Sequence, residues 1–265
     1  GTGTVSTMSG GSQSVRGGGT GTVSAMISGR QNIDESGTIG TVITMSDDGQ
    51  QVINFSGTGK VSTMNGGVQV IDRVGIGIVD VMNSGIQSID KGTGTVNTMN
   101  NGSQIVRAGG SGTIDVMISG EQNITSGAAG TVNTMSGGNQ NVNGGTGTVS
   151  TMSGGSQRIY SGAGTVSTMI NGSQNVNRNT TGTIDIMSGG MQSVVQNANG
   201  IINTMSNGNQ KIIAGTGTVS TMISGEQNII GGGTGTISAM SGGTQKISNG
   251  GSGTVSTCLL YTSDA

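Results

Sequence analysis

Methionine recurs along this chain at steps of 17, 18 or 19 residues, and this period restricts the possible folds more than any other feature. With each of these methionines taken as position 0, every copy has Gly at −5, Val or Ile at −3, Gln at +5 and Val or Ile at +7. A low-complexity tract does not hold these positions in register over 14 copies, so a disordered chain is excluded. The repeat methionines are Met8, Met26, Met45, Met64, Met82, Met99, Met117, Met135, Met152, Met169, Met187, Met205, Met222 and Met240.

Each repeat contains two short runs of alternating apolar and polar residues, and each run is followed by Gly-rich turn residues. Gly makes up 55 of the 265 residues, which disfavours helices. Two strands within a fixed period are typical of one coil of a parallel β-solenoid, in which coils stack at about 4.8 Å. The sequence therefore predicts an all-β chain: a single right-handed parallel β-solenoid (β-helix) of about 14 coils of about 18 residues, with two short strands per coil, over residues 1–257.

The apolar columns at −3 and +7 are expected to point into the coil, together with the small or β-branched residue at −1. Strict alternation would turn the methionine outward, whereas its presence in every copy favours a core position at a bend, so the pattern leaves both open. Gly at −5 and +3 is interpreted as supplying the positive φ angles of turns. The Gln column predicts a structural ladder of amide hydrogen bonds between coils. Its members are Gln13, Gln31, Gln50, Gln69, Gln87, Gln104, Gln122, Gln140, Gln157, Gln174, Gln192, Gln210, Gln227 and Gln245.

The composition argues against catalysis and metal binding. The chain has no His and one Cys, so the usual ligands of zinc, copper and haem are missing, as are Ser-His-Asp and Cys-His catalytic groups. Carbohydrate-cleaving β-helices need paired carboxylates, whereas the 12 acidic residues here scatter over different coil positions. The densest group, Asp34, Glu35, Asp47 and Asp48, lacks the spacing of calcium-binding β-rolls. We predict no enzymatic activity, no cofactor and no catalytic or metal site.

Nucleic acids and membranes are also unexpected partners. Ten Lys and Arg residues are spread over the chain, and aromatic residues make up 1% of it, so there is neither a basic patch nor a stacking platform. No apolar stretch approaches the roughly 20 residues needed to span a bilayer. We therefore predict no nucleic-acid binding and no membrane insertion by this segment.

The last eight residues, 258–265, break the repeat where the next methionine is due. Their string C-L-L-Y-T-S-D-A resembles the translation of a transposon adapter used in sequencing libraries. We expect residues 258–265 to be a non-native tail and residues 1–257 to be a fragment truncated at both ends. A capping strand is the alternative. On the first interpretation, Cys258 says nothing about redox state.

Small hydroxylated residues dominate two outward columns. Position −4 is Thr in 11 of 14 copies, and position −2 is Ser in seven. Thr and Ser are also ordinary residues of a solvated strand, so these columns need not have a function.

The string M-S-G-G-S-Q-x-V-x-x-G-x-G-T-V-S-T resembles the passenger repeats of self-associating autotransporter adhesins of the AIDA and TibA type, over all of residues 1–257. The resemblance implies secretion to the bacterial cell surface and anchoring in the outer membrane through a barrel outside this fragment. It implies adhesion, autoaggregation or biofilm formation, with like passengers and host or neighbouring cell surfaces as partners. The period departs from the family's, being nearer 18 than 19.

The resemblance also implies O-glycosylation with heptose by a heptosyltransferase. From their expected outward position, the candidate acceptors are Ser6, Ser24, Ser62, Ser150, Ser167, Ser220, Ser238, Thr4, Thr22, Thr148, Thr165, Thr218 and Thr236.

An ice-binding β-solenoid is the second hypothesis, because Thr4-Val5-Ser6 and its repeats loosely resemble a flat Thr-x-Thr array. Seven residues interrupt the array, namely Ile43, Lys60, Ile78, Asp80, Asp115, Asp185 and Ile201.

Overall fold

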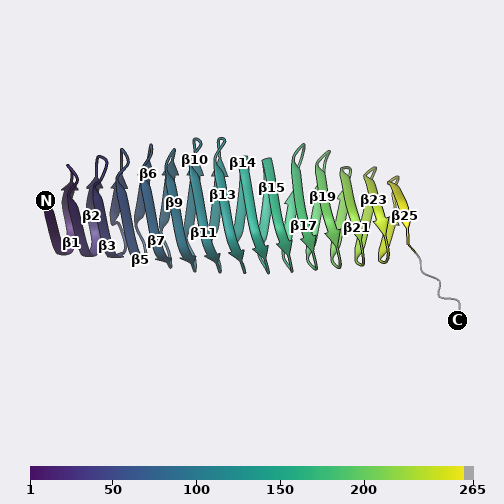
Figure 1. The fold of residues 1–265 in the computed structure, drawn as a ribbon, viewed down its shortest axis with the longest axis horizontal. Coiled ribbons are helices and arrows are strands. Elements are labelled where there is room, and N and C mark those ends of the chain that lie inside the picture. The colour runs from purple at the N-terminus through teal and green to yellow at the C-terminus, as the bar shows by residue number, and fades with distance from the viewer. Residues whose placement is uncertain (260–265) are drawn as a thin grey trace. The chain divides into compact units, whose positions relative to one another are not determined.

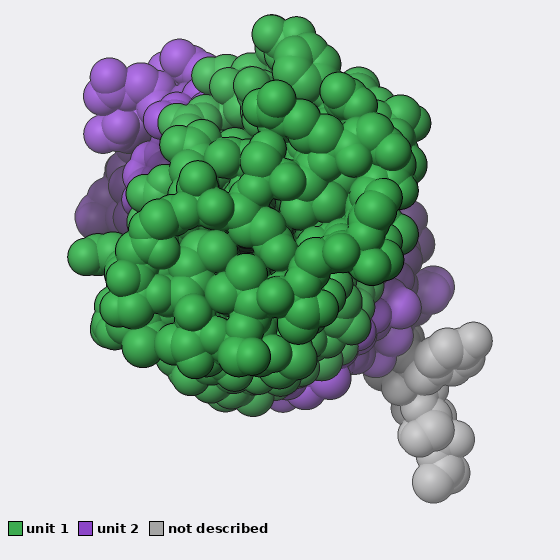
Figure 2. All heavy atoms as spheres, turned by 90° about the vertical axis from the view of Figure 1, so that its left-hand side faces the viewer, with its two compact units in different colours: residues 1–139 green, residues 140–265 purple. Residues whose placement is uncertain are grey.

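The computed structural model describes residues 1–259, which form strands and turns without any helix. The strands are parallel and stack as a β-solenoid of about 14 turns with a spacing of about 18 residues, which confirms the predicted fold class (Figure 1). The chain divides into two compact units, Gly1–Asn139 and Gln140–Ala265, coloured separately in Figure 2. The expected tail begins inside the last strand, which ends at Cys258, and residues 260–265 lie outside the described part.

In most coils of unit 1 the chain forms two strands, which we call the first arm, of seven residues, and the second arm, of four or five residues. Strands β1 (Thr2–Val15) and β2 (Thr20–Ile33) run through both arms. The separate first arms are β3 (Ile39–Met45), β5 (Thr58–Met64), β7 (Ile76–Met82), β9 (Thr93–Met99), β11 (Ser111–Met117) and β13 (Ala129–Met135). The second arms are β4 (Gln50–Ile53), β6 (Val68–Asp72), β8 (Ile86–Asp90), β10 (Ser103–Arg107) and β12 (Glu121–Thr125).

Unit 2 repeats the same scheme. Strands β14 (Asn139–Met152) and β15 (Ser156–Met169) each join a second arm to the next first arm. The remaining first arms are β17 (Thr181–Met187), β19 (Asn199–Met205), β21 (Thr216–Met222), β23 (Thr234–Met240) and β25 (Ser252–Cys258). The remaining second arms are β16 (Ser173–Val176), β18 (Met191–Val195), β20 (Asn209–Ile213), β22 (Glu226–Ile230) and β24 (Thr244–Ile247).

The methionine column lies in the core, which settles the alternative left open by the alternation pattern. From Met45 to Met222 every repeat methionine is 0% exposed, as are the Val and Ile residues at −3 from Val23 to Ile237. The strand bends before the methionine: in β11 the ladder pairs Ile114, Val116 and Met117 with the next coil and skips Asp115. The bend turns two successive residues outward and thereby returns the methionine to the core.

The prediction that position −1 points inward is wrong for the same reason. Val116 and Ile186, both at this position, are 36% and 49% exposed, although an inward apolar residue would be buried. Positions −2 and −1 together form the corner of the coil at which the chain bends.

Gly at −5 does not have the turn role assigned to it from the sequence. These residues lie within first-arm strands and have no positive φ; instead they face the core. A Cβ on Gly112 would lie 2.5 Å from Val106 Cγ2 and 2.7 Å from Gln104 Oε1. The missing side chain makes room for the glutamine and aliphatic columns opposite. Gly at +3 does have a positive φ, for example +101° at Gly102.

Hydrogen bonds between glutamine amides run through the interior of each unit. Nε2 of a glutamine donates to Oε1 of the glutamine one coil earlier at 2.7 or 2.8 Å, from Gln31 to Gln122 in unit 1 and from Gln157 to Gln245 in unit 2. The same nitrogen also donates to the carbonyl of the Gly at −5 in its own coil, as Gln87 does to Gly77 at 3.3 Å. Each internal amide is thereby satisfied without water.

Gln50 is wrong as a member of this ladder. It is exposed on the outer side of β4, and Gln51 takes the inward place, donating to Gln31 Oε1 at 2.8 Å. The preceding turn, residues 46–49, is one residue longer than its counterparts. The following strand is therefore displaced by one position, so Ile53 rather than Val52 pairs with the core residues Ile33 and Ile71.

Candidate functional site

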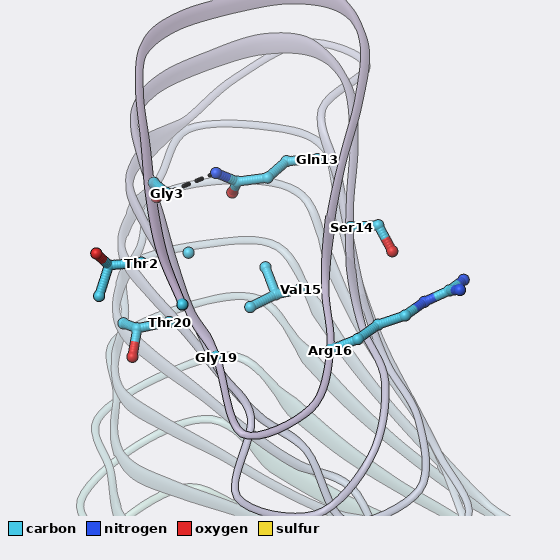
Figure 3. A pocket seen from close by; sticks show the side chains of 10 residues that line it. Thr2, Gly3, Gln13, Ser14, Val15, Arg16, Gly19 and Thr20 are labelled. Carbon is cyan, nitrogen blue, oxygen red and sulfur yellow. Dashed lines mark hydrogen bonds between the residues drawn. The ribbon is translucent and has the colours of Figure 1, made fainter.

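The outer faces of the arms carry the candidate functional residues. In the first two coils, Thr2 and Thr20 point away from the interior, whereas Gln13 points into it (Figure 3). The hollow drawn there is lined by Gln13 and Val15, which begin the inward columns, so it is the end of the core and not a separate site.

The predicted acceptor residues are all accessible to solvent. The −2 serines lie at the corner of the coil and the −4 threonines on the first arm; among them Ser6, Ser238 and Thr4 are exposed and the others are half-buried. The structure therefore brings the serines and threonines of neighbouring coils together in columns, with parallel strands about 4.8 Å apart. Their modification stays a prediction.

A second threonine column, at position −6, was missed by the sequence analysis. Positions −6 and −4 share the outer face of the first arm because the Gly between them faces the core. The −2 serine lies at the corner itself, where the strand ladder skips a residue, so the two residues on the flat face are those at −6 and −4 and not the Thr and Ser of Thr-Val-Ser. The signal was the string Thr-Gly-Thr, which occurs with both threonines in seven rows: Thr2/Thr4, Thr20/Thr22, Thr93/Thr95, Thr146/Thr148, Thr181/Thr183, Thr216/Thr218 and Thr234/Thr236.

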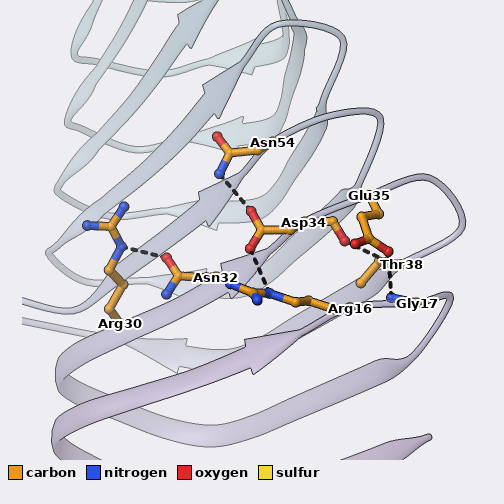
Figure 4. Close-up of polar contacts among 8 residues, drawn as sticks. All are labelled: Arg16, Gly17, Arg30, Asn32, Asp34, Glu35, Thr38 and Asn54. Carbon is orange, nitrogen blue, oxygen red and sulfur yellow. Dashed lines mark hydrogen bonds and ion pairs between the residues drawn. The ribbon is translucent and has the colours of Figure 1, made fainter.

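The acidic cluster of the sequence is divided between two turns. Asp34 and Glu35 follow β2, whereas Asp47 and Asp48 follow β3, so the seven residues of β3 separate the two pairs. Asp34 accepts from Asn54 Nδ2 at 2.9 Å and lies 3.4 Å from Arg16 Nε (Figure 4). Glu35 accepts from the backbone N–H of Gly17 at 2.9 Å. These carboxylates therefore stabilise the turns between coils.

Within residues 1–259 no three His, Cys, Asp or Glu side chains gather as a metal ion would require. The same residues include no helix able to cross a bilayer.

Comparison with known proteins yields no relative. No protein-family model, no curated protein and no solved structure matches this chain. The geometry of its surface therefore has to carry the functional argument.

The corner column contains Asp–Asn pairs that the sequence analysis overlooked. Nδ2 of Asn97, Asn133 and Asn203 donates to the Asp one coil earlier at 3.1, 2.8 and 2.9 Å. Those aspartates are Asp80, Asp115 and Asp185, which the sequence analysis treated only as interruptions. In the sequence each Asp at −2 is followed by Asn at −2 in the next copy, so alignment of the repeats on methionine would have revealed the pairs.

Asn133→Asp is expected to lower the free energy of unfolding by about 0.5–1 kcal/mol at neutral pH, because it places two carboxylates opposite each other on neighbouring strands. Thermal unfolding at low and high salt measures this, and added salt should reduce the loss by screening the two charges. Asn133→Ser is the control, since it removes the hydrogen bond without adding charge and should cost less. A loss for Asn133→Asp no larger than the control's would contradict the pairing.

Proposed function

We propose that this chain is a structural and adhesive segment of a bacterial cell-surface protein, the passenger of an autotransporter, and that it mediates adhesion, autoaggregation or biofilm formation. The observation that carries the proposal is the set of accessible hydroxyl columns repeated coil after coil. Many weak, equally spaced contacts between two such surfaces gain avidity from valency alone. The proposal includes secretion to the cell surface, outer-membrane anchoring by a segment other than residues 1–257, and no catalytic activity.

Display of the whole chain on a bacterium that does not aggregate tests the adhesive role. The displaying cells are expected to settle faster than cells that display an unrelated protein of similar size, and soluble chain added in excess should slow the settling. Unchanged settling, together with no binding to surfaces or other cells, would rule out the adhesive role.

O-heptosylation of the outward residues is the second part of the proposal. The chain co-expressed with a heptosyltransferase is expected to gain mass in whole heptose units, measured on the intact protein. Replacement of four corner serines by alanine should reduce the gain, whereas replacement of four turn serines should not. The corner set is Ser24, Ser62, Ser167 and Ser220, and the matched turn set is Ser136, Ser188, Ser206 and Ser241. An unmodified mass, or an equal reduction in both sets, would contradict these assignments.

Ice binding remains the second candidate function, favoured by the Thr-Gly-Thr rows on the first arm. Threonines at −6 and −4 lie about 6.7 Å apart along a strand, and rows repeat at about 4.8 Å, so hydroxyl and methyl groups form a grid. In unit 1 the grid is interrupted at six places, by Ile39, Lys60, Ile76, Ile78, Ser111 and Ala129. Thermal hysteresis of the purified chain distinguishes the candidates, because an adhesin without ice affinity produces none.

A further inference from the structure

One stretch of the second-arm face in unit 1 is apolar where the other coils are largely polar. This patch consists of Val52, Val68, Val70, Ile86 and Ile105 on the neighbouring strands β4, β6, β8 and β10. Val52 is 6% exposed and the other four are half-buried, all at outward positions between core residues. The equivalent positions elsewhere hold mostly Ser, Asn, Arg, Lys or Glu, so the strand itself does not require these aliphatic side chains.

Opposite charges flank the patch at its two ends. One outward column runs through Arg30, Gln50, Val68, Ile86, Ser103 and Glu121 on six successive strands. Arg30 and Glu121 are exposed, and each is held by the asparagine two residues further on. Arg30 Nε donates to Asn32 Oδ1 at 2.6 Å, and Asn123 Nδ2 donates to Glu121 Oε2 at 3.3 Å (Figure 4 shows the first pair).

This arrangement is complementary to itself under a two-fold rotation. An axis parallel to the strands, placed between β6 and β8, sets Arg30 of one molecule opposite Glu121 of a second copy, and Glu121 opposite the second copy's Arg30. The same rotation lays Val68 on Ile86 and Val52 on Ile105. We infer that the patch is an interface for a second copy of this chain, packed face to face with the two solenoid axes antiparallel. The inference rests on the proposed self-association and specifies its face and register.

Parallel packing of the same faces is disfavoured by the neighbouring column. A two-fold axis along the solenoid would set the column of Val68 and Ile86 against the column of Asp72 and Asp90, which lies four residues further along β6 and β8. Aliphatic side chains would then cover carboxylates and remove them from water without a partner, which costs free energy.

The antiparallel pair is expected to be weak and reversible. Six rows about 4.8 Å apart, on second arms of four or five residues, cover an area at the low end of specific protein interfaces. At the rim, Asp72 faces Asp90 of the second copy, so like charges oppose association. Removal of the Asp72 and Asp90 charges should therefore strengthen the pair. A nonspecific apolar contact would not depend on these two carboxylates in particular.

Sedimentation velocity of the whole chain over a range of concentrations, in a Cys258→Ser background, tests the charges. Arg30→Glu is expected to raise the dimer dissociation constant about ten-fold, because two ion pairs become repulsive. The double variant Arg30→Glu/Glu121→Arg should restore it, and Asp72→Asn/Asp90→Asn should lower it several-fold. Arg158→Glu, on the second-arm face of unit 2, is the matched control and should change nothing.

Disulfide trapping tests the register. Gln50 and Ser103 lie three strands apart in one molecule but opposite each other in the antiparallel pair. In the same Cys258→Ser background, which removes the exposed native thiol, a mixture of Gln50→Cys and Ser103→Cys chains should form a crosslinked dimer on oxidation, and either variant alone should not. Association that is unaffected by Arg30→Glu, or trapping by either single variant to the same extent, would overturn this interface and leave self-association intact. A chain that stays monomeric at every concentration would overturn both.

Discussion

Replacement of Gln87 by Met is expected to destabilise the solenoid by about 4 kcal/mol, because it removes the amide while nearly preserving the side-chain volume. Gln87 is 0% exposed; it donates to Gln69 Oε1 and accepts from Gln104 Nε2, both at 2.7 Å. The substitution leaves Gln69 Oε1 without a donor and removes the shortest hydrogen bond of Gln104 Nε2, which keeps only its longer bonds to the Gly94 and Thr113 carbonyls. It also removes the bonds from Gln87 Nε2 to the Gly77 and Thr95 carbonyls, and each buried polar group left unsatisfied costs about 1–3 kcal/mol. Chemical denaturation followed by circular dichroism measures the loss.

Gln13→Met is the matched control for Gln87→Met. Gln13 begins the ladder, is only half-buried, and donates solely to the Gly3 carbonyl at 3.2 Å. Gln13 Oε1 also accepts from Gln31 Nε2 at 2.7 Å. After the substitution Gln31 keeps its bond to the Gly21 carbonyl, and water can reach the Gly3 carbonyl at the end of the stack, so the expected loss is only about 1 kcal/mol. Because coils contact chiefly their neighbours, a defect in the middle of the stack should also broaden or split the unfolding transition, whereas a defect at the end should not. Equal stability of the two variants would show that the ladder contributes little beyond packing.

Gly77→Ala is expected to cost about 3 kcal/mol, although the change adds a single methyl group. The new Cβ would lie 2.3 Å from Ile71 Cδ1, 2.6 Å from Ile71 Cγ1 and 2.7 Å from Gln69 Oε1. Both neighbours are 0% exposed and are held by further coils, so the core cannot accept the group without moving. Chemical denaturation again measures the loss.

A compensating change and a turn glycine complete the test of Gly77→Ala. Ile71→Ala alone opens a cavity, but in combination with Gly77→Ala it also removes the clash, so the double variant should be more stable than the sum of the two losses predicts. Gly109→Ala, at a turn with φ +80° and no atom within 4 Å of the added Cβ, tests backbone conformation alone and should cost about 1 kcal/mol. Additive losses in the double variant would contradict the packing explanation.

The inward columns could be predicted because each is a single residue type at one repeat position. Val or Ile at −3 and Gln at +5 recur in every copy, and only a stack of coils gives such residues a common environment. The error at Gln50 arose where two glutamines adjoin: counting from Met45 selects the first, whereas hydrogen bonding to Gln31 and Gln69 selects Gln51. A longer turn cannot be located by counting alone.

The bend before the methionine could not be predicted from alternation. Strands alternate their side chains, so Met and Val at an odd separation should face opposite sides. The structure places both in the core by turning two residues outward at the corner, and this choice depends on what packs across the coil. Because of the same bend, the two hydroxylated residues that share the outer face of the first arm are Thr2 and Thr4, and not Thr4 and Ser6 as the sequence suggested.

The sequence by itself determined the repeat, the parallel stack and the identity of most core columns, since each follows from one residue type recurring at one period. Only the tertiary structure decided the direction of the methionine, the place of Gln51 rather than Gln50 in the ladder, and the grouping of Arg30, Glu121 and the aliphatic residues between them on one face. The physical reason is that residues in contact on neighbouring coils lie about 18 positions apart in the chain, so their grouping depends on where each turn ends and which way each strand faces.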